Sequence, residues 1–254
     1  MSELEFVQIG ARDDNFCVFV HDAVSGRTAA VDAPEAEAMH ATLDQRGWRL
    51  DTLLITHHHY DHVEGIASLY ERFGCEVIGP RAEADKIDGL TRQVAEGDTF
   101  DLYGHAVTVV DTPGHTLGHI VYYLPDARVL FAGDTLFSLG CGKLFEGSPA
   151  DMWSSLQKIR ALPGDTTVYV GHEYTVENGE HALQWEPGNA ALVERMETAR
   201  ALHAAGQPTV PTSLQQELET NPFLRPDSQE IRATLDMTSA SDLDVFTRVR
   251  ELRG

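Results

Sequence analysis

Histidine and aspartate side chains crowd one short stretch of the sequence, THHHYDH at residues 56–62. His57 and His59 are two residues apart, a spacing that shares a face in an extended chain but not in a helix. They are therefore expected at the end of the apolar strand before them, with His58 pointing the other way. His58 and His62 have helical spacing, but a zinc-protease helix needs Glu directly after the first His, and the next residue here is another His. The extended arrangement is the one we adopt.

Further residues of metal-ligand type follow this stretch. Asp61 stands where the next helix should begin, a position at which aspartate is also common as a simple helix cap. His115, Asp134 and His172 each follow an apolar strand further along the chain. Because α/β folds display site residues where strands end, these residues together with the first cluster predict a metal site.

Seven ligands exceed the four of a tetrahedral zinc, so two metal ions are expected. Two metals about 3.5 to 4 Å apart can share a water whose pKa falls far below that of bulk water, toward about 7. The pattern predicts a centre that makes hydroxide at neutral pH, with Asp61 and Asp134 as its catalytic carboxylates. His58 and His119 are candidates for hydrogen bonds that orient the ligands. The natural partition gives the first metal His57, His59 and His115, the second metal Asp61, His62 and His172, and both metals Asp134.

The elements that must hold these ligands are short β-rich runs, separated by Gly, Pro and Asp turns and interspersed with helical patterns. The strands do not alternate regularly with helices, so a mixed two-sheet α/β layer covered by helices fits better than a doubly wound parallel sheet. The patterns predict strands over 5–9, 15–22, 27–33, 50–56, 75–80, 105–112, 119–125, 128–134 and 166–172, and helices over 33–47, 63–74 and 149–164.

The pattern of predicted secondary structure changes after about Gly171, and helical patterns dominate the rest of the chain. We therefore expect two domains, a catalytic domain over 1–173 and a helical substrate-binding domain over 174–254. The helices of this second part are predicted over 188–206, 213–220, 227–236 and 241–253.

Composition limits the classes of partner. With 19 Lys and Arg against 40 Asp and Glu, the net charge of -21 repels nucleic acid and anionic membrane surfaces. No segment approaches the roughly 18 continuous apolar residues of a membrane span, and three scattered cysteines imply no disulfide framework. We expect a cytoplasmic monomer that acts on a small molecule and binds neither nucleic acid nor membrane.

The motifs THHHYDH, TPGHT, AGDTLF and GHEYT, in this order, resemble those of the metallo-β-lactamase superfamily. GCGKLFEG at 140–147, WEPGN at 185–189, NPFLR at 221–225 and the helical tail narrow the resemblance to the glyoxalase II family, the hydroxyacylglutathione hydrolases. This resemblance implies an αββα sandwich with a C-terminal helical domain. It also implies hydrolysis of S-D-lactoylglutathione and related S-2-hydroxyacylglutathiones to glutathione and D-lactate, a step of methylglyoxal detoxification, by a hydroxide that bridges two metals.

The resemblance further implies residues that bind glutathione. Lys143 and Tyr174 are expected to contact the glutathione moiety, which carries two carboxylates and so needs a local cationic patch on this acidic protein. Arg250 and Arg253, three apart and so on one face of the last helix, match the basic pair of the family's C-terminal domain. A solvated helix face is the alternative explanation for these arginines. Phe145 stands where the family commonly has Tyr, which removes a phenolic hydrogen bond of order 1 kcal/mol.

Several alternatives remain open at this stage. Two zinc ions are expected, but His and carboxylate ligands suit iron and manganese as well. A persulfide dioxygenase with one iron is an alternative enzyme on the same fold, and the presence of Asp61, His62 and His172 argues against it. A hydrolase of another thioester, lactone or β-lactam also fits, because the fold accepts all of these substrates. A non-enzymatic metal-binding scaffold is the last alternative.

Overall fold

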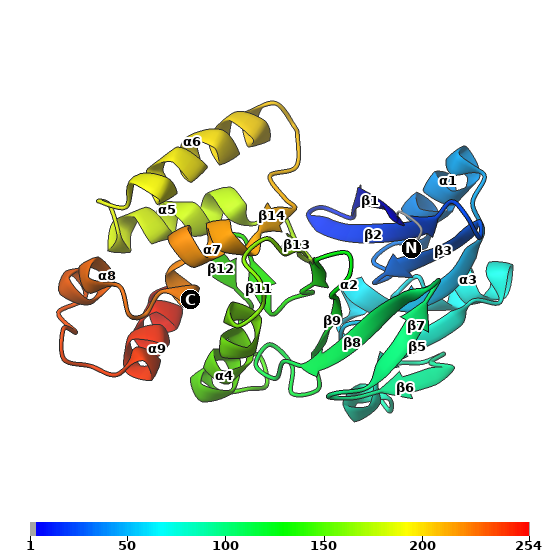
Figure 1. Ribbon diagram of the computed structural model, residues 1–254, viewed down its shortest axis with the longest axis horizontal. Coiled ribbons are helices and arrows are strands. Elements are labelled where there is room, and N and C mark those ends of the chain that lie inside the picture. The colour runs from blue at the N-terminus through cyan, green and yellow to red at the C-terminus, as the bar shows by residue number, and fades with distance from the viewer. Residues whose placement is uncertain (1–3, 254) are drawn as a thin grey trace. The chain divides into compact units, whose positions relative to one another are not determined.

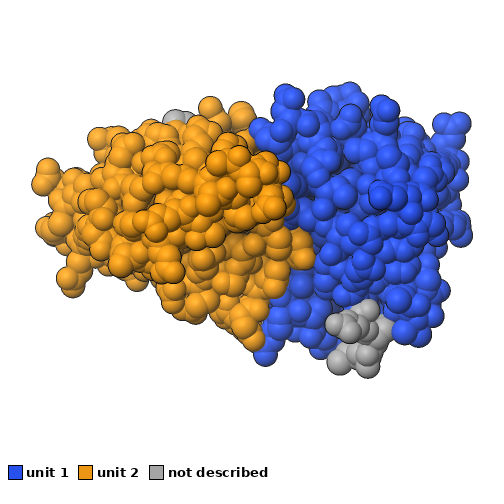
Figure 2. Space-filling model, turned by 90° about the horizontal axis from the view of Figure 1, so that it is seen from above, with its two compact units in different colours: residues 1–111, 118–133 blue, residues 112–117, 134–254 orange. Residues whose placement is uncertain are grey.

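The computed structural model describes residues 4–253 of the 254-residue chain. The chain divides into two compact units, coloured separately in Figure 2: unit 1 comprises residues 1–111 and 118–133, and unit 2 comprises residues 112–117 and 134–254. Among the described residues, no helix has the length and apolar character needed to cross a membrane.

The first sheet of unit 1 is mixed, with the strand order β1-β2-β3-β4-β5-β6 (Figure 1). The first three strands pair antiparallel, and the pairings from β3 to β6 are parallel. Every residue of β2, NFCVFVHD, is buried, as expected for a strand covered on both faces. The strands are β1 (Leu4–Ala11), β2 (Asn15–Asp22), β3 (Arg27–Val31), β4 (Leu50–Leu54), β5 (Glu76–Pro80) and β6 (Arg92–Val94).

Four further strands of unit 1 form an antiparallel layer in the order β10-β9-β8-β7. Tyr122 of this layer donates its hydroxyl to the carbonyl oxygens of Ile55 and Ile78, at 2.8 and 3.2 Å, so the layer faces the parallel strands of the first sheet. Phe6 and Phe131 also meet between the layers, with ring centroids 6.3 Å apart. The strands are β7 (Thr99–Leu102), β8 (His105–Asp111), β9 (Ile120–Leu124) and β10 (Val129–Phe131).

Helices cover the first sheet of unit 1. Met39 and Leu43 of α1 and Ile66 and Leu69 of α3 are buried in one apolar cluster with residues of the strands. Both helices stop at a glycine in the left-handed conformation, Gly47 at φ 66° and Gly74 at φ 62°, which is a common way to end a helix. The helical segments are α1 (Ala36–Arg46), α2 (Tyr60–Val63), α3 (Ile66–Phe73) and the 3-10 turn η1 (Arg81–Glu83).

Unit 2 is mostly helical, with two short β-pairs, β11 with β12 and β13 with β14. Its first helix begins with a capping box in which Ser148 and Asp151 satisfy each other's backbone N–H groups. Leu139, Ala182, Leu192 and Met196 form an apolar cluster. The elements are β11 (Leu136–Phe137), β12 (Gly140–Cys141), α4 (Pro149–Arg160), β13 (Thr167–Tyr169), α5 (Thr175–Trp185), α6 (Ala190–Ala204), β14 (Thr212–Ser213), α7 (Leu214–Thr220), η2 (Pro222–Leu224), α8 (Gln229–Thr234) and α9 (Asp242–Arg253).

The structure confirms the predicted α/β class, its mixed sheets and its helical C-terminal part. It adds elements that were not predicted: the strands β6 and β7, the β11–β12 hairpin and helix α5. The three cysteines are free and buried, in agreement with the absence of a disulfide framework. The predicted domain boundary between residues 173 and 174 stays a prediction.

Candidate metal centre

Four predicted ligands of unit 1 lie together, His57 and His59 in the loop after β4 and Asp61 and His62 in the short helix α2. We call these four residues the loop group. The donor atom of His57 lies within 4.8 Å of those of His59 and His62. Asp61 Oδ2 lies 3.6 Å from His62 Nε2. His57 and His62 are buried, whereas Asp61 keeps about a third of its side chain exposed, at 34%. The loop and the helix that follows it therefore bring three imidazoles and a carboxylate together.

Hydrogen bonds determine the tautomer of two imidazoles in the loop group, His57 and His62. The Thr56 hydroxyl donates to Asp32, so it accepts from His57 Nδ1, 3.0 Å away. His62 Nδ1 lies 2.8 Å from Asp32 Oδ2 and donates to it. In each ring the proton sits on Nδ1, so Nε2 keeps the lone pair that a metal requires.

Other residues of unit 1 contact the loop group through hydrogen bonds and ring stacking. Asn15 Nδ2 donates to Asp61 Oδ2 at 2.9 Å and to the Asp61 carbonyl oxygen at 3.2 Å. The buried Glu83 accepts from the backbone N–H of His58 at 2.7 Å, and its Oε2 lies 2.9 Å from His58 Nδ1. The ring of His119 stacks on that of His57, with centroids 4.8 Å apart. His58 thus contacts Glu83 and His119 contacts His57, and a role of either histidine in orienting the ligands stays a prediction.

Three predicted ligands of unit 2 also lie together, and we call His115, Asp134 and His172 the strand-end group. Asp134 Oδ2 lies 3.3 Å from His115 Nε2 and 3.3 Å from His172 Nε2. All three side chains are buried, with 4 to 5% of each residue exposed. One carboxylate oxygen is therefore equidistant from two imidazole nitrogens, and all three atoms lie close enough together to bind divalent metal.

The backbone carbonyl of Lys143 determines the tautomer of the His115 imidazole. His115 Nδ1 donates to the Lys143 carbonyl oxygen at 2.7 Å, and because a carbonyl can only accept, Nε2 carries the lone pair. Gly142, just before Lys143, lies so close to Asp134 that a Cβ there would stand 1.9 Å from the Asp134 carbonyl oxygen. Only glycine fits this contact.

The predicted substrate residues Lys143 and Tyr174 both lie near the strand-end group. The Lys143 side chain is exposed, and its Nζ lies 5.8 Å from the ring centre of Phe145, itself 62% exposed. The Phe145 ring contacts His115 edge-on at 5.3 Å. The ring of Tyr174 stacks on His172 at 4.9 Å with an interplanar angle of 4°.

The two predicted arginines have partners within unit 2. Arg250 is buried, and its Nη1 donates to the Cys141 carbonyl oxygen at 3.1 Å. Arg253 donates from Nε to Asn178 Oδ1 at 3.2 Å and pairs with Glu177 at 3.0 Å. Their role in binding glutathione stays a prediction, but the solvated helix face is not what the structure shows for Arg250.

A cysteine nucleophile finds no support. Cys141 is buried, and burial raises the pKa of its thiol to about 11, with Arg250 acting in the opposite direction. A thiol with this pKa is protonated at neutral pH and therefore unreactive.

The donor set fits a divalent metal. His57, His62 and His115 each present a lone pair on Nε2, and two carboxylates supply the oxygen ligands that accompany histidine in hydrolytic metal sites. Asp32, Asn15 and Glu83, which orient the loop group, were not found from the sequence. The only local signal was for Asp32, an acidic residue at the end of β3.

The fold and these residues define a member of the metallo-β-lactamase superfamily. The family model described as the metallo-beta-lactamase superfamily matches residues 22–172. A crystal structure of the BLEG-1 B3 metallo-beta-lactamase aligns with a TM-score of 0.66 at 22% identity, covering 87% of this chain and 100% of that one. A crystal structure of ETHE1 from Myxococcus xanthus aligns with a TM-score of 0.68 at 23% identity, covering 98% of each chain. These structures establish the fold.

Comparisons with relatives of higher sequence identity identify the family within this superfamily. The model of the hydroxyacylglutathione hydrolase C-terminus matches residues 173–254. The hydroxyacylglutathione hydrolase of Rhizobium meliloti (strain 1021) is 50% identical over 251 residues, which cover 99% of this chain and 98% of the relative. That of Brucella ovis is 51% identical over 248 residues, covering 98% and 96%. The chain belongs to the hydroxyacylglutathione hydrolase family, and it is a hydrolase that binds divalent metal.

Proposed function

We propose that this enzyme hydrolyses the thioester of S-2-hydroxyacylglutathiones, with S-D-lactoylglutathione as the principal substrate, and releases D-lactate and glutathione. The full-length relatives at about 50% identity carry the name hydroxyacylglutathione hydrolase. The observation that carries the chemistry is Asp134, whose Oδ2 lies 3.3 Å from both His115 and His172. We assign this carboxylate to two metals, because hydrolytic enzymes use such pairs of metals to activate water.

We further propose that the loop group and the strand-end group supply one dinuclear centre. Zinc bound there would act as a Lewis acid and lower the pKa of bound water toward about 7. In this assignment His57, His59 and His115 hold the first ion, Asp61, His62 and His172 hold the second, and Asp134 holds both. The hydrogen bonds that hold the ring proton of His57, His62 and His115 on Nδ1 support the assignment. Each imidazole then offers the lone pair of Nε2 to a metal without a change of tautomer.

The remaining residues bind and orient the substrate. Asn15 fixes the Asp61 carboxylate, which we assign to ligation and to orienting the attacking water. Lys143, exposed and next to Phe145, is assigned to a carboxylate of glutathione, and Tyr174 to its peptide portion. The thiolate of glutathione leaves without a general acid, because thiols have a pKa near 8.5. The cytoplasmic location, the monomeric state and the division into residues 1–173 and 174–254 belong to the same proposal.

A hydrolysis assay with metal analysis tests this function. The purified enzyme is compared on S-D-lactoylglutathione and on a lactoyl thioester of a small neutral thiol, and bound metals are counted. We expect two metals per chain and at least a tenfold higher kcat/KM for the glutathione thioester, since its carboxylates pair with the cationic residues. Equal kcat/KM values would contradict glutathione specificity. One iron per chain with oxygen consumption on glutathione persulfide would identify a dioxygenase instead.

A further inference from the structure

The β11–β12 hairpin connects two residues of the proposed site. Leu136 pairs with Cys141 in this hairpin, and the N–H of Gly142 donates to the Thr135 carbonyl oxygen at 3.2 Å, which extends the pairing to its base. Asp134 therefore directly precedes the paired residues of the hairpin and Lys143 directly follows them. Because the Lys143 carbonyl also sets the His115 ring, any shift of the hairpin moves the Asp134 carboxylate, the His115 imidazole and the Lys143 side chain together.

The residue at the tip of this hairpin, Leu139, has an unfavourable backbone conformation. Leu139 adopts φ 58°, in the left-handed region that a bulky L-residue rarely occupies. Such a conformation persists only where surrounding contacts hold it, and it is found most often at functional sites. The contacts that hold this tip come from helix α7 and the turn after it, about 80 residues further along the chain, as hydrogen bonds spanning 78 to 84 residues show.

Glu217 of α7 is the centre of these contacts. Its carboxylate is fully buried and accepts from the Leu139 N–H at 2.8 Å and from the Ser138 hydroxyl at 2.9 Å. Asn221 Nδ2 donates to the same carboxylate at 3.0 Å and to the carbonyl oxygens of Phe137 and Gly140, each at 3.0 Å. Two side chains thus bind the backbone on both strands and at the tip of the hairpin.

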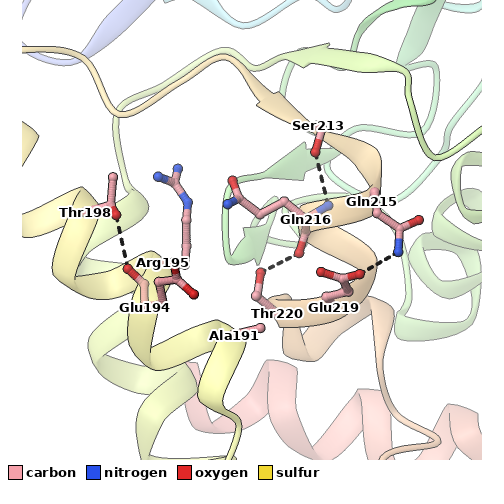
Figure 3. Close-up of a pocket in the computed structure, with 9 residues that line it drawn as sticks. All are labelled: Ala191, Glu194, Arg195, Thr198, Ser213, Gln215, Gln216, Glu219 and Thr220. Atoms are coloured by element: carbon pink, nitrogen blue, oxygen red, sulfur yellow. Dashed lines mark hydrogen bonds between the residues drawn. The ribbon is translucent and has the colours of Figure 1, made fainter.

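Arg195 of α6 supports the same tip. Its Nη2 donates to the Ser138 hydroxyl oxygen at 3.1 Å and to the Thr209 carbonyl oxygen at 2.8 Å. Figure 3 shows Arg195 extending from α6 at a pocket of about 290 Å³, with Gln216 and Glu219 of α7 among the other lining residues. The positive guanidinium offsets part of the cost of burying Glu217, a burial that raises the pKa of the Glu217 carboxyl.

An apolar residue at position 217 would fill the same space without burying a polar carboxyl group, so we expect this group to do more than pack. We propose that Glu217 is a positioning residue for the metal site and the thiol site: through the tip of the β11–β12 hairpin it fixes where Asp134, His115 and Lys143 lie. This inference rests on the proposed function for the identity of the substrate and for the roles of Asp134, His115 and Lys143, whereas the hairpin and its contacts are observed wholly within unit 2.

The test compares Glu217→Gln with Glu219→Gln, a substitution two residues further along the same helix at an exposed position. Glutamine keeps the size of Glu217 but turns one acceptor oxygen into a donor, which then faces the Leu139 N–H, the Ser138 hydroxyl or the Asn221 amide. Zn²⁺ affinity is measured by competition with a chelator, hydrogen exchange is followed over residues 136–143, and kcat and KM are determined on S-D-lactoylglutathione. We expect Glu217→Gln to lower Zn²⁺ affinity about tenfold to a hundredfold, to raise exchange in 136–143 and to raise KM severalfold. Glu219→Gln should match the wild type.

A folded Glu217→Gln variant with wild-type Zn²⁺ affinity and wild-type exchange in 136–143 would overturn the proposal. Should this variant fail to fold, Ser138→Ala decides, because it removes one donor to Glu217 and leaves those of Leu139 and Asn221 in place. Reduced Zn²⁺ affinity supports the proposal and unchanged affinity overturns it. Failure of the wild type to hydrolyse S-D-lactoylglutathione would instead count against the proposed function, and the affinity and exchange measurements would still judge Glu217.

Discussion

Asp32 shows how one buried carboxylate can orient two candidate metal ligands, His57 and His62. It accepts from the Thr56 N–H and hydroxyl and from His62 Nδ1, and the Thr56 hydroxyl in turn accepts from His57. Asp32 itself sits at φ 59°, a conformation that aspartate tolerates better than most residues. The hydrogen-bond chain is directional, so it works only while the group at position 32 accepts.

Replacing Asp32 with Asn should therefore lower metal affinity. An amide that turns its NH₂ toward His62 forces Nδ1 to accept and moves the ring proton to Nε2, the atom assigned to the metal. We expect Zn²⁺ affinity to fall about tenfold to a hundredfold in chelator competition. Asp22→Asn is the matched control, since Asp22 is equally buried but caps the turn at Val24 and Ser25. Equal affinities in the two variants would refute the tautomer argument.

Lys143→Ala should weaken substrate binding and leave the chemical step largely intact. The lysine side chain is exposed, and an exposed ion pair contributes at most about 1 kcal/mol, which corresponds to a rise in KM of about fivefold. Steady-state kinetics on S-D-lactoylglutathione measures this effect, with kcat expected to stay within about twofold. Lys158→Ala, at an exposed position of α4, serves as the control. An unchanged KM for Lys143→Ala would remove Lys143 from the glutathione site.

At the scale of elements, two motifs that suggested the family turn out to hold helices together. Glu186 of WEPGN accepts from Arg225 of NPFLR through both of its oxygens, at 2.8 and 3.2 Å. Ser228, the cap of α8, and Asn189, the cap of α6, also donate to Glu186. Burial raises the pKa of Glu186, but these hydrogen bonds outweigh it, and the net pKa is lowered. This carboxylate thus joins the starts of two helices to the η2 turn.

Glu186→Gln should destabilise the protein in a pH-dependent way. A lowered pKa means that Glu186 stabilises the fold above its unfolded pKa of about 4.3 and that this contribution is lost as the pH falls through the folded value. We expect the free energy of unfolding in urea to drop by about 3 kcal/mol at pH 7, and the difference from wild type to shrink below about pH 4. Glu180→Gln breaks the exposed pair with Arg200 and should cost about 0.5 kcal/mol or less. A difference that does not change with pH would contradict the assigned ionisation.

Some elements were beyond prediction because distant contacts override local signals. Helix α5 contains Asn178 and Gly179, a pair typical of turns, yet the glycine is needed where α5 meets α6: a Cβ at Gly179 would stand 1.8 Å from Met196 Sδ. The β11–β12 hairpin likewise has Leu139 in a left-handed turn that Glu217 holds from far along the chain. Neither contact leaves a trace in the neighbouring sequence.

At the scale of the whole molecule, the candidate ligands were predictable and their supports were not. A histidine or aspartate directly after an apolar run is a local signal, which is why seven candidate ligands could be named from the sequence. The residues that set their protons and orientation act over long separations: Asp32 bonds to Thr56 and His62 across 24 and 30 residues, and Asn15 bonds to Asp61 across 46. Only the folded chain brings these partners together.

Metal bound to the folded chain should also stabilise the molecule as a whole. A ligand present at a hundredfold above its Kd adds about 2.7 kcal/mol to the free energy of unfolding, which for a chain of this size raises Tm by roughly 5 to 10 °C. We expect a chelator to lower the Tm of the wild type by this amount in calorimetry, and added Zn²⁺ to restore it. Asp134→Ala removes the carboxylate assigned to both metals, so this variant should be inactive, contain less metal, and show a smaller chelator effect on Tm. A variant that lost Asp134 but kept two metals and the full chelator-dependent shift would show that Asp134 does not bridge them.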